Sequence, residues 1–168
     1  MNNHLVMLCV LGTTFVFSGC GGREVSGPPE LKLGHHECAE CGMLINDERC
    51  SAAMIVDRGR GREYVMFDDI GCALDYEADN APEQKVLERF FHDHTSKQWI
   101  VSGPPVFVYA DRERLQTPMG SGIAAFATRS GAELVQREAT GDVIEFASLV
   151  SARRAWLEAH FGKTDSPR

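Results

Sequence analysis

The chain contains two similar stretches of short strands and helices, and neither is long enough to bury a large core by itself. In the first stretch, apolar runs over 52–56 and 64–67 flank a Gly/Arg-rich turn, which predicts a β-hairpin. Asp68 or Asp69 can cap a helix that follows at once, and 85–91 has the pattern of a further strand. We therefore expect an α+β fold whose halves pack together or depend on a metal.

The second stretch starts after Gly103-Pro104-Pro105, which interrupts the chain behind a short strand pattern at 99–101. It has the same mixture of strands and helices and ends in an amphipathic helix, with elements expected at 106–109, 123–127, 130–139, 143–146 and around 149–157. Ala-Ala-apolar strand patterns at 52–54 and 124–126 suggest an ancient duplication.

The amino terminus has the features of an export signal. Residues 5–17 are apolar or small and uncharged, and this run is shorter than the roughly 18 residues of a membrane-spanning helix. The motif Phe17-Ser18-Gly19-Cys20 resembles the lipobox of bacterial lipoproteins. This implies that Cys20 carries lipid and anchors the exported chain to a membrane, facing the periplasm or extracytoplasmic space. A cleaved signal peptide without lipid is the alternative, since residues 1–4 contain no Lys or Arg.

The patterns predict five successive parts of the chain. These are a signal peptide (1–19), a lipidated flexible tether rich in Gly, Pro and Ser (20–34), a first α+β half (35–95), a second α+β half (96–162) and a disordered tail (163–168).

The composition restricts the partners and the chemistry. With 17 Lys and Arg against 24 Asp and Glu, the net charge of −7 argues against a nucleic-acid partner. An apolar fraction of 43 % is ordinary for a folded domain. The six Cys, six Met and six His are unusual in a chain of 168 residues, and they direct attention to metal or redox chemistry.

The first of two sulfur-bearing loops contains Cys38 and Cys41, separated by two residues and followed by Gly42. This spacing lets both sulfur atoms face one metal ion, while the glycine permits a tight turn of the backbone. Outside the cytoplasm, an unmetallated pair could instead oxidise to a disulfide. Zinc is a further alternative, with a tetrahedral site completed by another Cys or a His, namely Cys50, Cys72, His35 or His36.

Methionine in both loops favours copper over zinc. Thioether sulfur is a poor ligand for Zn²⁺ and a good one for soft Cu(I), and Met43 lies two residues beyond the Cys pair. The second loop, Thr117-Pro118-Met119-Gly120, displays a methionine between proline and glycine rather than at a periodic helix or strand position. We expect Met119 to face the same ion as the cysteines, so that the site joins the two halves.

The sequence resembles the NosL family, lipoproteins that act as copper chaperones in the maturation of nitrous oxide reductase. The resemblance rests on elements throughout the mature chain, namely Cys20, the loop 38–43, the turn 93–99 and the segment 117–126. It implies two related ββαβ halves and a Cu(I) site formed by one or both of Cys38 and Cys41 together with Met43 and Met119. It also implies apo nitrous oxide reductase as the acceptor, and we expect a copper-supplying membrane protein as a second partner.

The segment 67–72 departs from the NosL pattern. It resembles the strand–turn–helix of YHS and TRASH-type treble-clef domains, in which a Cys joins the Cys-x-x-Cys pair on the metal. Cys72 is therefore either a third thiolate or a buried residue at the helix start, whereas Cys50 is expected in the core. Four histidines are weaker candidates for ligation: His35 and His36 beside the Cys pair, and His92 and His94, which would share one face of a strand.

These residues predict a metallochaperone without enzymatic turnover, which takes up Cu(I) through a few sulfur ligands and releases it by ligand exchange. The alternative is a structural-zinc lipoprotein that uses Cys38, Cys41 and Cys72 as ligands and serves as a protein-interaction module. Thiol–disulfide exchange or a cysteine-based lyase is disfavoured, because Gly42 and a strand pattern, rather than a helix, follow the Cys pair.

Overall fold

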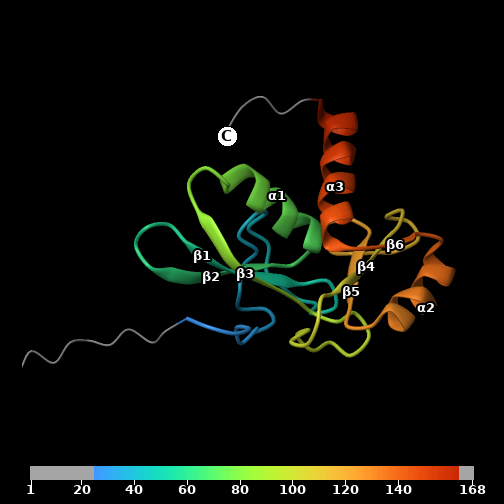
Figure 1. Ribbon diagram of the computed structural model, residues 1–168, viewed down its shortest axis with the longest axis horizontal. Helices are drawn as coiled ribbons and strands as arrows, with labels where there is room; N and C mark the ends of the chain where they lie inside the picture. Colours follow the sequence, from blue (N-terminus) through green and yellow to red (C-terminus); the bar gives the residue numbers. More distant parts are fainter. Residues whose placement is uncertain (1–24, 163–168) are drawn as a thin grey trace, which may run out of the picture.

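A computed structural model of the chain describes residues 25–162 (Figure 1). The predicted signal peptide (1–19), the lipidated Cys20 and the predicted tail (163–168) lie outside the described residues. Within 25–162, no helix has both the length and the hydropathy that crossing a membrane requires.

The first half is a three-stranded antiparallel sheet with one helix. Its elements are β1 (Ala52–Asp57), β2 (Arg62–Phe67), α1 (Ile70–Asn80) and β3 (Lys85–Phe91), and the strand order is β2-β1-β3. The hairpin pairs Ala52 with Phe67 at its base and Asp57 with Arg62 at its tip. The predicted hairpin, helix and strand of this half are all present.

The second half repeats this topology. Its elements are β4 (Val106–Tyr109), β5 (Ile123–Phe126), α2 (Arg129–Ala139) and β6 (Asp142–Ile144), in the strand order β5-β4-β6. In both halves the order along the chain is ββαβ and the first strand is central, which confirms the expected fold of two related α+β halves. The two Ala-Ala patterns are not equivalent, however, because one lies in the central strand β1 and the other in the edge strand β5.

Both internal helices begin at a side-chain cap. The Asp69 carboxylate accepts a hydrogen bond from the Gly71 backbone N–H at 2.7 Å at the start of α1. The Thr128 hydroxyl accepts one from the Gly131 N–H at 3.2 Å at the start of α2. Such bonds satisfy backbone donors that have no partner inside the helix.

Two predicted strands differ from the structure. The segment 99–101 forms only a single bridge, between Trp99 and His92, and the Trp99 indole N–H donates to the Pro29 carbonyl at 2.9 Å. The strand expected at 143–146 ends at Ile144, since Glu145 already caps the closing helix α3 (Phe146–Phe161).

The two halves share one hydrophobic core. Phe91 of β3 and Phe107 of β4 meet edge-to-face with ring centroids 5.1 Å apart, and Leu149 of α3 is fully buried in the same cluster. Figure 1 shows α1 and α3 next to each other, and a bidentate pair joins them, with Arg153 donating to Asp75 at 2.9 and 2.6 Å. The halves therefore pack together through apolar side chains.

Part of the predicted tether is packed against the first half. The Tyr64 hydroxyl of β2 lies 2.9 Å from the carbonyl oxygens of both Ser26 and Gly27, and Pro29 is buried beside Trp99. From residue 25 onward, the stretch predicted as a free tether over 20–34 is thus held by side chains that lie far away in the sequence. Composition alone indicated flexibility here, but these long-range hydrogen bonds override it.

Candidate metal centre

Three cysteines and one aspartate converge where the first sulfur-bearing loop meets the start of α1. One ligand atom from each of Cys38, Cys41, Asp68 and Cys72 lies within 4.8 Å of all the others. We refer to these four residues as the thiol cluster. Sulfur and carboxylate oxygen at such separations can bind a single ion.

The backbone of the first loop turns tightly around the cluster. The Cys38 N–H donates to the Met43 carbonyl at 2.8 Å, and the Gly42 N–H donates back to the Cys38 carbonyl at 2.9 Å. Gly42 has φ 74°, a conformation that favours glycine. A further bond from the Ala39 N–H to the Met66 carbonyl, at 2.8 Å, fixes the loop to β2, which leads directly into Asp68.

The cluster is enclosed on most sides. Cys38, Asp68 and Cys72 are 2, 2 and 6 % exposed, respectively, whereas Cys41 is half-buried. The Cys41 thiol contacts both carboxylate oxygens of Asp68, at 3.7 and 3.8 Å. An ion held here would therefore be reached from the Cys41 side.

The thiols differ in acidity because they hydrogen-bond to one another. Cys72 donates to Cys38, and this bond, working against burial, lowers the pKa of Cys38 to about 7. The same bond, together with burial, raises the pKa of Cys72, and burial raises the pKa of Cys41 to about 11. Three thiolates beside a carboxylate repel one another, so full deprotonation of the cluster needs a bound cation.

The second sulfur-bearing loop is joined to the cluster through Asp69. This fully buried carboxylate accepts hydrogen bonds from the Thr117 hydroxyl at 2.7 Å and from the Met119 backbone N–H at 2.9 Å. Because Asp69 directly follows Asp68, these bonds hold the loop of the second half beside the thiol cluster of the first.

The two loops line one groove of about 370 Å³. Its walls combine apolar and polar side chains from both halves: Met43, Leu44, Asn46, Asp47, Arg49, Asp68, Gln116, Thr117 and Pro118. The side chains of Met43 and Met119 are 47 and 46 % exposed, respectively. The exposed Met43 thioether is free to approach an ion in the groove that it lines, and Met119 follows Thr117 and Pro118 of the same wall.

The structure brings together the predicted Cys38, Cys41 and Cys72, and it adds Asp68 to them. The sequence predicts that Asp68 or Asp69 caps the helix; Asp69 caps α1, while Asp68 contacts the Cys41 thiol. The sequence does contain a signal for this role of Asp68, since one helix needs a single capping residue and two aspartates precede this helix. Met43 lines the groove, and the backbone of Met119 is fixed by the hydrogen bond from its N–H to Asp69.

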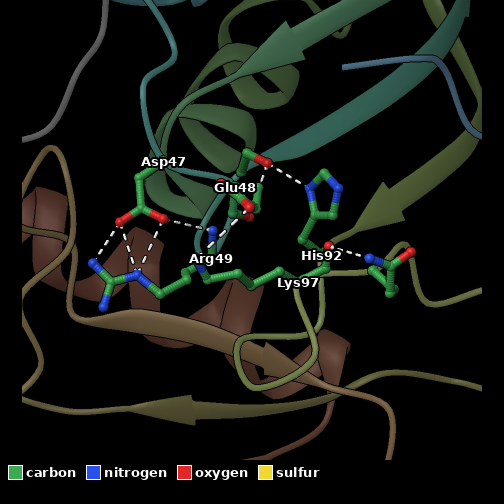
Figure 2. A network of polar contacts seen from close by, with 7 residues as sticks. Asp47, Glu48, Arg49, His92 and Lys97 are labelled. Atoms are coloured by element: carbon green, nitrogen blue, oxygen red, sulfur yellow. Dashed lines mark hydrogen bonds and ion pairs between the residues drawn. The ribbon is translucent and has the colours of Figure 1, made fainter. Parts of the chain in front are cut away.

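The remaining candidates lie outside the thiol cluster. His35 is exposed, and His36 accepts a hydrogen bond from the Lys32 backbone N–H at 3.1 Å. His92 lies 2.6 Å from the Ser51 hydroxyl and stacks on Trp99, as the polar network of Figure 2 shows in part. His92 and His94 do not share a strand as expected, because β3 ends at Phe91 and His94 lies in the following turn, where its ring contacts Phe126. Cys50 is buried, as expected, and burial raises its pKa to about 12.

Comparison with known proteins agrees with this architecture. The crystal structure of the copper chaperone NosL from Shewanella denitrificans superposes with a TM-score of 0.56 and 21 % identity, covering 74 % of this chain and 99 % of that one. No protein of curated function matches the sequence. The model of the NosL family matches residues 31–153, which include both halves and both sulfur-bearing loops, and the chain therefore belongs to the NosL family.

Proposed function

We propose that this protein is a copper chaperone that carries Cu(I) in the thiol cluster and the adjoining groove. The observation that carries the proposal is the convergence of Cys38, Cys41, Cys72 and Asp68 within 4.8 Å, beside a groove lined by Met43. Thiolate and thioether sulfur prefer soft, monovalent copper. The solved relative with this fold is described as a copper chaperone.

Carrier function requires release as well as binding. Buried Cys38 and Cys72 hold the ion, whereas half-buried Cys41 and an exposed methionine can exchange with an incoming ligand. Copper then passes to the acceptor by successive ligand substitution, with no change in its oxidation state. The transfer needs no general acid, base or covalent intermediate, so we infer a carrier rather than an enzyme.

The wider setting is proposed from the family resemblance. The chain is exported and attached to the membrane through lipid on Cys20, it receives copper from a membrane protein, and it loads apo nitrous oxide reductase. Replacing Cys20 with Ser tests the attachment. The variant is expected in the soluble extracytoplasmic fraction, while the wild type sediments with membranes; equal sedimentation of both would contradict lipid anchoring.

Structural zinc is the second candidate, and Asp68 favours it, since three thiolates and one carboxylate form a closed tetrahedral set. A structural zinc site contributes directly to folding. Here, however, Phe67 and Ile70 of the first half are fully buried in an apolar core that continues into the second half through Phe107 and Leu149. We therefore expect removal of metal to leave the fold intact.

Anaerobic titration with Cu(I) against a chromogenic chelator tests the proposal. A reduced soluble form, residues 21–168, is expected to bind one equivalent tightly. Cys41→Ser and Met119→Leu should both weaken binding; Cys50→Ala and Met66→Leu are matched controls outside the cluster. Unaltered Cu(I) affinity in Cys41→Ser would contradict the copper site, and unfolding upon removal of zinc would favour the structural alternative.

A further inference from the structure

We infer that Asp69 is a positioning residue that sets the metal preference of the site by holding the Met119 loop against the thiol cluster. The inference rests on the proposed copper function and extends it to a residue that does not itself bind metal. It starts from one buried carboxylate that makes hydrogen bonds to both halves of the molecule.

Asp69 has two separate tasks. Its Oδ1 accepts from the Gly71 N–H at 2.7 Å and caps the helix that carries Cys72. Its Oδ2 accepts from the Thr117 hydroxyl at 2.7 Å and from the Met119 N–H at 2.9 Å. One carboxylate thus connects the helix of a cluster thiol to the loop of the thioether.

The second half shows that capping alone does not require a carboxylate. The equivalent helix α2 is capped by Thr128, whose single hydroxyl accepts from Gly131 at 3.2 Å. Burying a carboxylate costs far more free energy than burying a hydroxyl unless further donors compensate for lost solvation. Asp69 is 0 % exposed, and the donors that compensate its second oxygen both come from the second loop.

The second loop also approaches α1 closely at this point. A Cβ atom added at Gly71 would lie 2.5 Å from the Cβ atom of Ser121. The Thr117 hydroxyl lies 3.3 Å from that of Ser121 and accepts from the Gly122 N–H at 3.3 Å, which continues the network through the loop. The position of Met119 relative to Cys72 is therefore fixed by direct packing and by the Asp69 carboxylate.

The link between Asp69 and the Met119 loop affects whether the site prefers Cu(I) or Zn²⁺. The thiol cluster alone offers three thiolates and a carboxylate, a ligand set that suits Zn²⁺. A thioether adds little for Zn²⁺ but favours Cu(I). If Asp69 holds Met119 in place, then breaking this link should weaken Cu(I) binding and leave Zn²⁺ binding nearly unchanged.

The test compares Cu(I) and Zn²⁺ affinities of residues 21–168 by anaerobic chelator competition. Thr117→Val removes the hydroxyl donor to Asp69 but keeps the helix cap, and it is expected to lower Cu(I) affinity about tenfold and Zn²⁺ affinity less than about twofold. Thr117→Ser retains the donor and should restore Cu(I) affinity. In a Met119→Leu background, Thr117→Val should have no further effect, because the residue acts through the thioether.

Two further variants separate positioning from general destabilisation. Asp69→Asn can still accept from Gly71 through its carbonyl oxygen, but its NH₂ group cannot accept from Thr117 or Met119, so it should reproduce the selective loss. Thr128→Val removes the cap of the other helix and should leave both affinities unchanged. Thermal unfolding of each variant without metal confirms that the compared proteins are folded.

The outcomes distinguish this inference from the proposed function. Failure of the wild type to bind Cu(I) overturns the proposed function itself. Tight Cu(I) binding by the wild type with no loss in Thr117→Val and Asp69→Asn overturns the positioning role alone. An equal loss of Cu(I) and Zn²⁺ affinity in these variants, or a full additional loss in the Met119→Leu background, also overturns it.

Discussion

Two neighbouring aspartates have different roles at the same junction. Asp68 contacts the Cys41 thiol at 3.7 Å, whereas Asp69 caps α1 and binds the second loop. Both residues lie in the bend between β2 and α1, where each carboxylate has its own partners, so one serves the ligand set and the other the loop.

Replacing Asp68 with Asn should change metal preference in the direction opposite to Thr117→Val. The carboxylate is a hard ligand that matters more for Zn²⁺ than for Cu(I). We expect Zn²⁺ affinity to fall about tenfold or more, equivalent to roughly 1.4 kcal/mol, with a smaller change for Cu(I). Chelator competition with both metals measures this, and Asp79→Asn, an exposed position on α1 outside the cluster and the groove, is the control. A larger loss for Cu(I) than for Zn²⁺ would exclude Asp68 as a preferential zinc ligand.

His92 should make the stability of the protein depend on pH. Burial lowers its pKa from 6.5 to about 4, so the folded state favours the neutral imidazole and the unfolded state binds a proton more readily. Its contribution is fully present above pH 6.5 and is lost as the pH falls towards 4, by up to about 3 kcal/mol. Urea unfolding at pH 7 and pH 4.5 measures the difference. His92→Gln should show a smaller pH dependence than the wild type, and equal pH dependence of the two proteins would contradict the assignment.

At the residue scale, sequence spacing identified the thiols but not their oxygen partner. Cys38 and Cys41 are close in the chain, and a local turn is enough to bring their sulfur atoms together. Asp68 enters the cluster because the Ala39 N–H of the loop donates to the Met66 carbonyl of β2, two residues before Asp68, which is a tertiary contact. A capping role was the reasonable local interpretation, and it is correct for Asp69.

At the scale of secondary structure, hydrophobic patterning predicted the hairpin of the first half, the strands at 106–109 and 123–126 and both internal helices. The local rules hold there because the strands are short and apolar and the helix caps are encoded next to the helices. These local rules fail at 99–101, where Trp99 donates a hydrogen bond to the carbonyl of Pro29, 70 residues away. They also fail at 25–34, where Tyr64 holds a segment whose composition indicates flexibility.

The close approach of the second loop to α1 makes Gly71 sensitive to any side chain. Gly71→Ala places a Cβ atom 2.5 Å from the Ser121 Cβ atom, so we expect a loss of about 1–3 kcal/mol in stability. Because the loop must shift, Cu(I) affinity should fall as well. Gly131→Ala, at the corresponding turn of α2, is the control and should have a smaller effect, since its nearest contact is 3.2 Å. Denaturant unfolding and metal titration measure both quantities, and an unaltered Gly71→Ala variant would show that the loop is not tightly packed.

At the scale of the whole molecule, the shared core predicts that both halves unfold together. Leu149→Ala removes a fully buried side chain from the cluster that joins them and should cost about 3 kcal/mol. Trp99 and Trp156 report on different regions, so fluorescence and far-UV circular dichroism should give coincident transitions. Leu134→Ala is a suitable control, because that side chain is 59 % exposed. Two separate transitions would instead indicate independent domains.

The packing of residues 25–29 against β2 and Trp99 shortens the free linker between the proposed lipid anchor and the folded part of the protein. If Cys20 carries lipid as proposed, only the five residues 20–24 separate the bilayer from the first fixed contact, a span of at most about 18 Å. If all fifteen residues of the predicted tether, 20–34, were free, the linker could span three times that distance. The folded part of an anchored molecule would then begin directly beside the lipid headgroups, because residue 25 could not move further from the bilayer than that span.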